Sequence, residues 1–259
     1  MKTVPSKDGT AIAFECMGRG PPLILIGGAL ADHRFYAPLA AELAPHFTVL
    51  NYDRRGRGHS GDTQPYHVDR EIEDLEALLA YCAPPAFVYG HSSGAALALR
   101  AAAAGLPIRR LVLAEPPFTP RGENDEKASG DFAEETAHVD ALRRRGDARG
   151  SAKFFLGSMG VSDDDIEDLL NSPAGAGFID CARALRYEYA ILGDGLVPTS
   201  RAARVAMPTL ILSGDAMQEA AAQLTRAMPN ARVENTGVSM HEMSPIDTAS
   251  RLKTAFLDE

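Results

Sequence analysis

Residues 87–94 are Phe87-Val88-Tyr89-Gly90-His91-Ser92-Ser93-Gly94. A short apolar run of the kind found in buried strands is followed at once by a G-x-S-x-G pattern, and an Ala- and Leu-rich stretch of helical character continues to Ala104. A turn this tight between a strand and a helix leaves no room for bulky flanking side chains, and glycine at both ends relieves the crowding. The pattern therefore predicts that Ser92 lies exposed at the end of a strand, where the N-terminus of the next helix favours negative charge.

Strand-like and helix-like segments alternate on both sides of this turn, which is typical of a mostly parallel sheet covered by helices. Strands are predicted at residues 10–17, 23–26, 47–52, 87–89, 111–114, 209–212 and 231–234. Helices are predicted at residues 35–43, 68–81, 93–104, 218–227 and 245–257. We expect an α/β fold with a mostly parallel sheet of about eight strands.

The alternation stops between residues 118 and 205, where the sequence has helix-like patches and no convincing buried strand. One helix is predicted to begin at Ser162, because three aspartates follow it and acidic residues favour a first turn. We expect a core domain made of residues 1–117 and 206–259, with residues 118–205 inserted as a helical cap.

Three motifs in order give the chain a resemblance to the α/β-hydrolase family over nearly its whole length. Beyond the elbow at Ser92, residues 53–60 resemble the D-x-R-G-x-G-x-S loop of the family, and His241 follows the last predicted strand, where the family has its base. A serine hydroxyl is a poor nucleophile until a neighbouring imidazole takes its proton. The resemblance implies that Ser92 is the nucleophile and His241 the base. His91 is expected to point away from Ser92 and to serve in packing.

The carboxylate that would orient His241 is where the sequence departs from the family. The usual acid follows the strand at 209–212 in a G-x-x-D pattern, and this chain has Met217 at that position. Two candidates remain open. Asp215 lies two positions early, while Glu115 follows the preceding strand, where some family members place their acid. We favour Glu115, with Asp215 as the alternative and a site without an acid as a third possibility.

The resemblance also implies an oxyanion hole made of the backbone N–H groups of Ala29 and Ser93. Candidate walls of the pocket are the large apolar side chains of the cap region: Phe118, Phe132, Phe154, Phe155, Met159, Tyr187 and Tyr189. Their number favours a hydrophobic small-molecule substrate.

The leading prediction is a serine hydrolase that cleaves a carboxylic ester, a lactone or a thioester through an acyl-enzyme on Ser92. The departure at Met217 keeps two alternatives open. One is cofactor-free chemistry of another kind on the same fold, such as carbon–carbon cleavage, a lyase or an oxygenase reaction. The other is a catalytically weak homologue that binds a ligand.

Net charge and composition limit the classes of partner and cofactor that we expect. A formal net charge of −9 argues against nucleic acid and against anionic membrane surfaces as partners. The three cysteines have no metal-type spacing, H-E-x-x-H does not occur, and no G-x-G-x-x-G opens a nucleotide-binding helix, so we expect no metal and no cofactor. The N-terminus lacks a signal-peptide core, so a cytoplasmic location is expected. The sequence gives no indication of oligomeric state.

Overall fold

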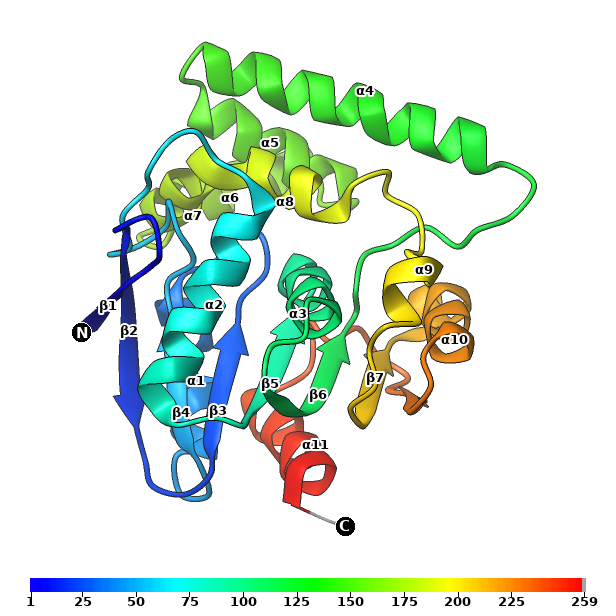
Figure 1. The fold of residues 1–259 in the computed structure, drawn as a ribbon. Helices are drawn as coiled ribbons and strands as arrows, with labels where there is room; N and C mark the ends of the chain where they lie inside the picture. The colour runs from blue at the N-terminus through cyan, green and yellow to red at the C-terminus, as the bar shows by residue number, and fades with distance from the viewer. Residues whose placement is uncertain (258–259) are drawn as a thin grey trace.

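The computed structural model describes residues 1–257, and its strands form one eight-stranded sheet (Figure 1). The strands are β1 (Lys2–Pro5), β2 (Ala11–Met17), β3 (Pro22–Ile26), β4 (Thr48–Tyr52), β5 (Ala86–His91), β6 (Ile108–Ala114), β7 (Thr209–Ser213) and β8 (Ala231–Asn235). Their order across the sheet is β1-β2-β4-β3-β5-β6-β7-β8. β2 pairs antiparallel with both β1 and β4, and the remaining pairs are parallel. The predicted α/β fold is confirmed.

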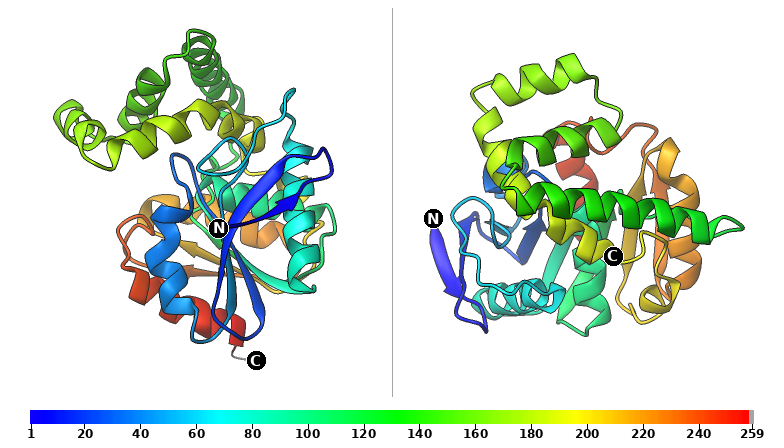
Figure 2. Two further views of the ribbon diagram at one scale, coloured as in Figure 1. Left: turned by 90° about the vertical axis from the view of Figure 1, so that its left-hand side faces the viewer. Right: turned by 90° about the horizontal axis from the view of Figure 1, so that it is seen from above.

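Helices cover both faces of the sheet (Figure 2). One face carries α1 (His33–Leu43) and α11 (Pro245–Leu257), and the other carries α2 (Val68–Cys82), α3 (Ser93–Ala103) and α10 (Gln218–Ala227). Alternation along β3 explains the two layers, because successive side chains of a strand point to opposite faces. Leu23 and Leu25 join the cluster with α1 and α11, whereas Ile24 and Ile26 join the cluster with α2 and α3.

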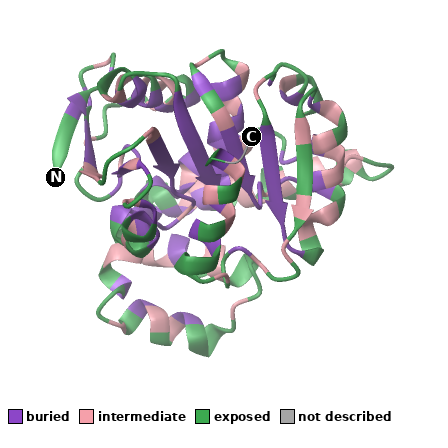
Figure 3. Ribbon diagram, turned by 90° about the horizontal axis from the view of Figure 1, so that it is seen from below, coloured by how far each residue is buried: buried purple, intermediate pink, exposed green. Residues whose placement is uncertain are grey.

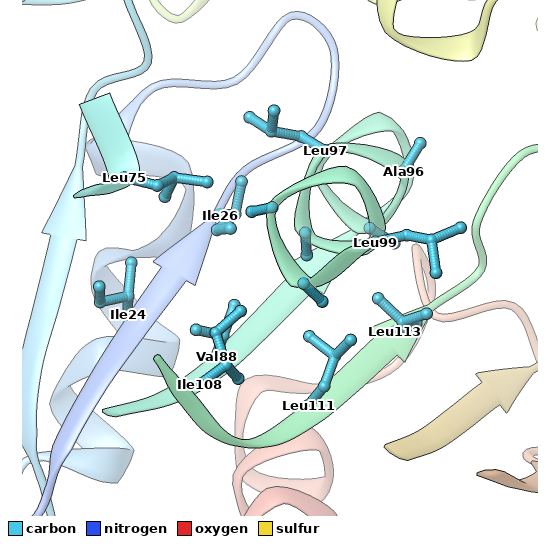
Figure 4. Close-up of a cluster of buried hydrophobic side chains, with 14 of the residues drawn as sticks. Ile24, Ile26, Leu75, Val88, Ala96, Leu97, Leu99, Ile108, Leu111 and Leu113 are labelled. Atoms are coloured by element: carbon cyan, nitrogen blue, oxygen red, sulfur yellow. The ribbon is translucent and has the colours of Figure 1, made fainter. Parts of the chain in front are cut away.

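Helix α3 lies close against the sheet because its contact face is made of small and aliphatic side chains. Leu97 and Leu99 lie beside the strand residues Ile26, Val88 and Leu113 in the close-up of Figure 4. The strands at the centre of the sheet are almost wholly buried, while the surrounding helices keep exposed residues on their outer sides (Figure 3). This packing fixes the direction of α3, and with it the turn at Ser92.

Between β6 and β7 the chain forms a helical insertion of α4 (Asp125–Arg144), α5 (Ala148–Ser158), α6 (Asp163–Asn171), α7 (Gly175–Cys181), η1 (Ala182–Ala184), α8 (Leu185–Leu192) and α9 (Thr199–Ala202). The arrowheads of β3, β5 and β6 point toward α4 to α8 in Figure 1, so these helices lie over the carboxyl ends of the strands. The Ser162 side chain accepts a hydrogen bond from the Asp165 N–H, which explains the start of α6. No helix within residues 1–257 has both the length and the hydrophobicity that crossing a bilayer requires.

Candidate active site

Ser92 occupies the turn between β5 and α3 with φ of +55°, a conformation that L-residues rarely adopt. Its N–H donates to the Ala114 carbonyl of β6 at 2.8 Å, which ties the turn to the neighbouring strand. A Cβ at Gly90 would lie 2.5 Å from the Gly94 carbonyl oxygen, and a Cβ at Gly94 would collide with the Ile26 carbonyl. Both glycines are therefore required sterically, as the spacing of the pattern predicts.

Ala29 and Ser93, whose N–H groups are the expected oxyanion donors, border the same cavity as Ser92. Within the described chain, the Ala29 N–H has no hydrogen-bond partner, and Ser93 is the first residue of α3, where the amides lack helical acceptors. Leu30 holds φ of +56° as the loop after β3 turns past Ser92. Gly28 permits this approach, because a Cβ there would lie 3.0 Å from the Ser92 Cβ. Two free donors thus lie beside the serine, which suits stabilisation of an oxyanion.

Glu115 is buried directly after β6 and has φ of +45°. One carboxylate oxygen accepts the Gly214 N–H at 3.2 Å, and the other accepts the Ser239 hydroxyl at 2.9 Å. Ser239 Oγ in turn accepts the His241 N–H at 3.2 Å. The carboxylate is consequently held by the loop that follows β7 and by the loop that carries His241.

The His241 imidazole borders the cavity with Ser92 and Glu115. A Glu115 oxygen and one ring nitrogen each from His91 and His241 lie within 4.8 Å of one another. In the described contacts, no hydrogen bond joins the His241 ring to Ser92 Oγ or to Glu115. Such bonds are commonly long without substrate and shorten in the complex. Desolvation lowers the pKa of His241, and the charges of Glu115 and Glu242 oppose that shift.

His91 is buried beneath His241, with the ring centroids 4.3 Å apart. Burial, assisted by His241, lowers the pKa of His91 to about 3, so its ring is neutral. Its Nδ1 lies 2.8 Å from the Tyr36 hydroxyl, which also accepts the Gly28 N–H at 3.1 Å. His91 does serve in packing, but it also supports the His241 ring and, through Tyr36, the loop next to Ala29. No sequence motif marks Tyr36 or Ser239 for these positions.

Asp215, the alternative acid, also borders the cavity but bonds elsewhere. It begins η2 (Asp215–Met217), is exposed, and accepts a hydrogen bond from the Asn235 side chain at 2.9 Å. Met217 contributes to the cavity wall. The structure therefore brings Glu115, and not Asp215, into the group of side chains around the His241 ring.

The cavity has a volume of about 630 Å³ and extends from Ser92 to the insertion. Of the side chains proposed as walls, Phe132, Phe155, Met159 and Tyr189 line it. Phe118, Phe154 and Tyr187 are absent from its described lining and lie in other contacts, such as the stacking of Tyr187 on Tyr66. Five carboxylates also line it: Glu115, Glu135, Glu188, Asp215 and Glu242.

The arginine-rich loop at residues 53–60 joins the core to the insertion. Buried Arg54 pairs with Glu71 of α2 at 2.8 Å and with Glu188 of α8 at 2.9 Å. Arg57 pairs with the second oxygen of Glu188, and Arg54 also donates to the Gly27 carbonyl at 3.2 Å. The loop thus connects the strand end next to Ala29 with a helix that lines the cavity.

Two groups of described side chains have the composition of a metal site. One is His91, Glu115 and His241 around the serine, and the other is Asp32, His33 and Asp53. In the second group the Asp53 oxygens already accept from the His33 and His59 N–H groups at 2.7 and 2.8 Å. Hydrogen bonds of this kind explain that group as part of the loop structure.

Comparisons with known proteins place the chain in a family. Residues 23–251 match the model of the alpha/beta hydrolase family. A solved structure of an alpha/beta hydrolase from Sphaerobacter thermophilus DSM 20745 is 42% identical, with a TM-score of 0.85 over 98% of this chain and 100% of that one. The enol-lactonase from Burkholderia xenovorans LB400 has a TM-score of 0.75 at 21% identity over 99% of this chain and 98% of that one, and this likeness shows the fold alone.

A curated relative, the pimeloyl-[acyl-carrier protein] methyl ester esterase of Stenotrophomonas maltophilia (strain R551-3), is 38% identical over 113 residues, which are 43% of this chain and 42% of the relative. The N-formylmaleamate deformylase of Pseudomonas putida is 37% identical over 109 residues, 40% of this chain and 41% of the relative. The chain thus matches about two fifths of the length of these relatives. Together with the family match, the esterase and deformylase names support hydrolase activity. This chain belongs to the alpha/beta hydrolase family.

Proposed function

We propose that the protein is a serine hydrolase that cleaves a small carboxylic ester, lactone or thioester with a hydrophobic body. The observation that carries the proposal is the meeting of Ser92, His241, Glu115 and two free backbone donors around one cavity. The esterase named among the relatives supports an ester as the scissile group. The apolar part of the wall, to which Phe132 and Phe155 belong, supports a hydrophobic substrate.

In the proposed reaction the His241 imidazole takes the Ser92 proton as Oγ attacks the carbonyl carbon. The Ala29 and Ser93 N–H groups hold the resulting oxyanion. The imidazolium then protonates the leaving group as the bond to it breaks, and an acyl group remains on Ser92. Water, deprotonated by His241, releases the acid. Glu115 favours the imidazolium through its charge, in keeping with the direction in which it moves the pKa of His241.

The test is labelling of the folded protein with a fluorophosphonate, followed by turnover of aryl esters, lactones and thioesters. Ser92→Ala is expected to abolish labelling. Ser158→Ala is the matched control, because Ser158 lines the same cavity but its hydroxyl bonds to the Phe155 carbonyl at 2.8 Å. Labelling of Ser92→Ala at the wild-type rate would overturn the assignment of Ser92 as the nucleophile. Labelling at Ser92 without turnover of any ester would instead favour carbon–carbon cleavage or another non-hydrolytic reaction.

A further inference from the structure

The charged side chains that line the cavity next to Ser92 are all acidic. Five carboxylates line it, and no Lys or Arg side chain of residues 1–257 belongs to that lining. The arrangement bears on the substrate because a ligand leaves water on entering, and charge contacts inside a partly enclosed site are then screened less than on the surface.

Two of the five carboxylates are already compensated. Glu188 is buried against Arg54 and Arg57, and Glu115 accepts two hydrogen bonds from neighbouring loops. Their charges are committed to the structure of the protein and to His241. These two carboxylates therefore need no ion pair with a cationic substrate.

The other three carboxylates have no ion pair within the described chain. Glu135 of α4 accepts only a long hydrogen bond of 3.4 Å from the Tyr189 hydroxyl. Asp215 accepts the Asn235 amide, and the Glu242 side chain has no hydrogen-bond partner among the described residues. They come from three separate segments, which are α4, the turn after β7 and the loop after β8, and all three segments border the cavity. A single carboxylate on a substrate would face all three.

The remaining wall suits an apolar body with a positive charge. Phe132, Phe155 and Tyr189 provide aromatic faces, which attract cations as well as burying hydrocarbon. Ser93, which is 3% exposed and borders the same cavity, has a hydroxyl without a hydrogen-bond partner in the described structure. This buried hydroxyl is an unsatisfied polar group in the cavity wall beside Ser92.

We infer that Glu135, Asp215 and Glu242 determine specificity, so that the cavity favours an apolar ester carrying an ammonium group over its neutral isostere, and rejects one carrying a carboxylate. The inference rests on the proposed function for the identity of the scissile bond. The charge preference itself is a property of binding. It also distinguishes this chain from its deformylase relative, whose named substrate, N-formylmaleamate, is an anion.

The test measures binding separately from turnover. Acetylthiocholine, its neutral isostere 3,3-dimethylbutyl thioacetate and an S-acetyl mercaptoalkanoate of matched length are titrated calorimetrically into Ser92→Ala protein. The cation is expected to bind about tenfold more tightly than the isostere, and the anion about tenfold more weakly, with both differences shrinking in 0.5 M salt. Equal affinities, or tightest binding of the anion, would overturn the inference whether or not the wild-type protein hydrolyses any of the three.

The matched variants assign the preference to the three side chains. Replacing Glu135, Asp215 and Glu242 together by Gln, Asn and Gln is expected to reduce the preference for the cation to about twofold or less. The control replaces Glu42, Glu76 and Glu126 by Gln, three exposed carboxylates outside the cavity lining that change the net charge by the same amount. The control is expected to keep the preference. Equal losses in both triple variants would assign it to overall charge and contradict the inference, and the individual variants repeat the comparison should a triple variant fail to fold.

Discussion

The Glu115 carboxylate accepts the Ser239 hydroxyl at 2.9 Å, across 124 positions of the chain. Because Ser239 also accepts the His241 N–H, this contact links the end of β6 to the loop of the proposed base. We predict that Glu115→Gln lowers kcat/KM by about 10³-fold, since an orienting carboxylate stabilises the imidazolium. Asp215→Asn should cost less than about tenfold. Steady-state kinetics of both variants on one activated ester decides whether Glu115 or Asp215 is the orienting acid. A larger loss in Asp215→Asn would assign that role to Asp215.

The pH dependence of kcat/KM should reflect the environment of His241. Its ring faces His91, Glu115 and Glu242, and desolvation holds its pKa below the ordinary value of about 6.5. The base is active when neutral, so activity should persist as pH falls below 6.5 and decline only at the lowered pKa. Glu115→Gln removes a charge that raises this pKa, so the acid limb should move to still lower pH. A limb that moves upward in this variant would contradict the proposed electrostatics.

Gly94 lies where any larger residue meets the backbone of β3. We predict that Gly94→Ala destabilises the protein by about 2–4 kcal/mol and removes the proposed hydrolase activity, because the new methyl must push apart the Ile26 carbonyl and the turn at Ser92. Gly130→Ala is the control, since Gly130 lies within α4 with open space around it and should gain about 0.5–1 kcal/mol. Urea unfolding measures both. Wild-type stability of Gly94→Ala would show that the turn relaxes freely.

Arg54 joins two buried carboxylates from different parts of the chain. Removing its charge leaves the buried Glu71 carboxylate without an ion pair and Glu188 with Arg57 alone, so Arg54→Met should lower the free energy of unfolding by about 3–5 kcal/mol. Arg19→Met, at an exposed arginine outside any described ion pair, should change it by less than about 0.5 kcal/mol. Chemical denaturation compares the two, and similar small changes in both would mean that the buried cluster contributes little to stability.

Most of the sheet could be predicted from sequence because its central strands are buried on both faces and form continuous apolar runs. β1 was missed because it has four residues, ends in Pro5 and buries only Val4. Such a strand has neither the length nor the alternation that marks strands in a sequence. Its pairing with β2 is a tertiary contact that a local pattern does not encode.

The candidate site could be predicted only in part, because many of its contacts are also tertiary. Ser92 lies in a local motif, and its turn can be derived from the spacing of two glycines. The contacts of Ser239, Tyr36 and His91 depend on loops that meet only after folding, and no spacing rule connects them. The same holds for the three unpaired carboxylates of the cavity, which come from separate segments.

The double pairing of Glu188 fixes one side of the cavity more firmly than the other. Helix α8 is tied by charge to the arginine loop, whereas α4, α5 and α6 pack largely on one another, on α8 and on the short helices beside them. Substitutions on α4 to α6 can therefore reshape the part of the cavity that α4 and α5 border, while the part around Ser92 keeps its geometry. Substitutions confined to those outer helices could therefore give a variant of this protein a different substrate range. A library for directed evolution should begin with these helices.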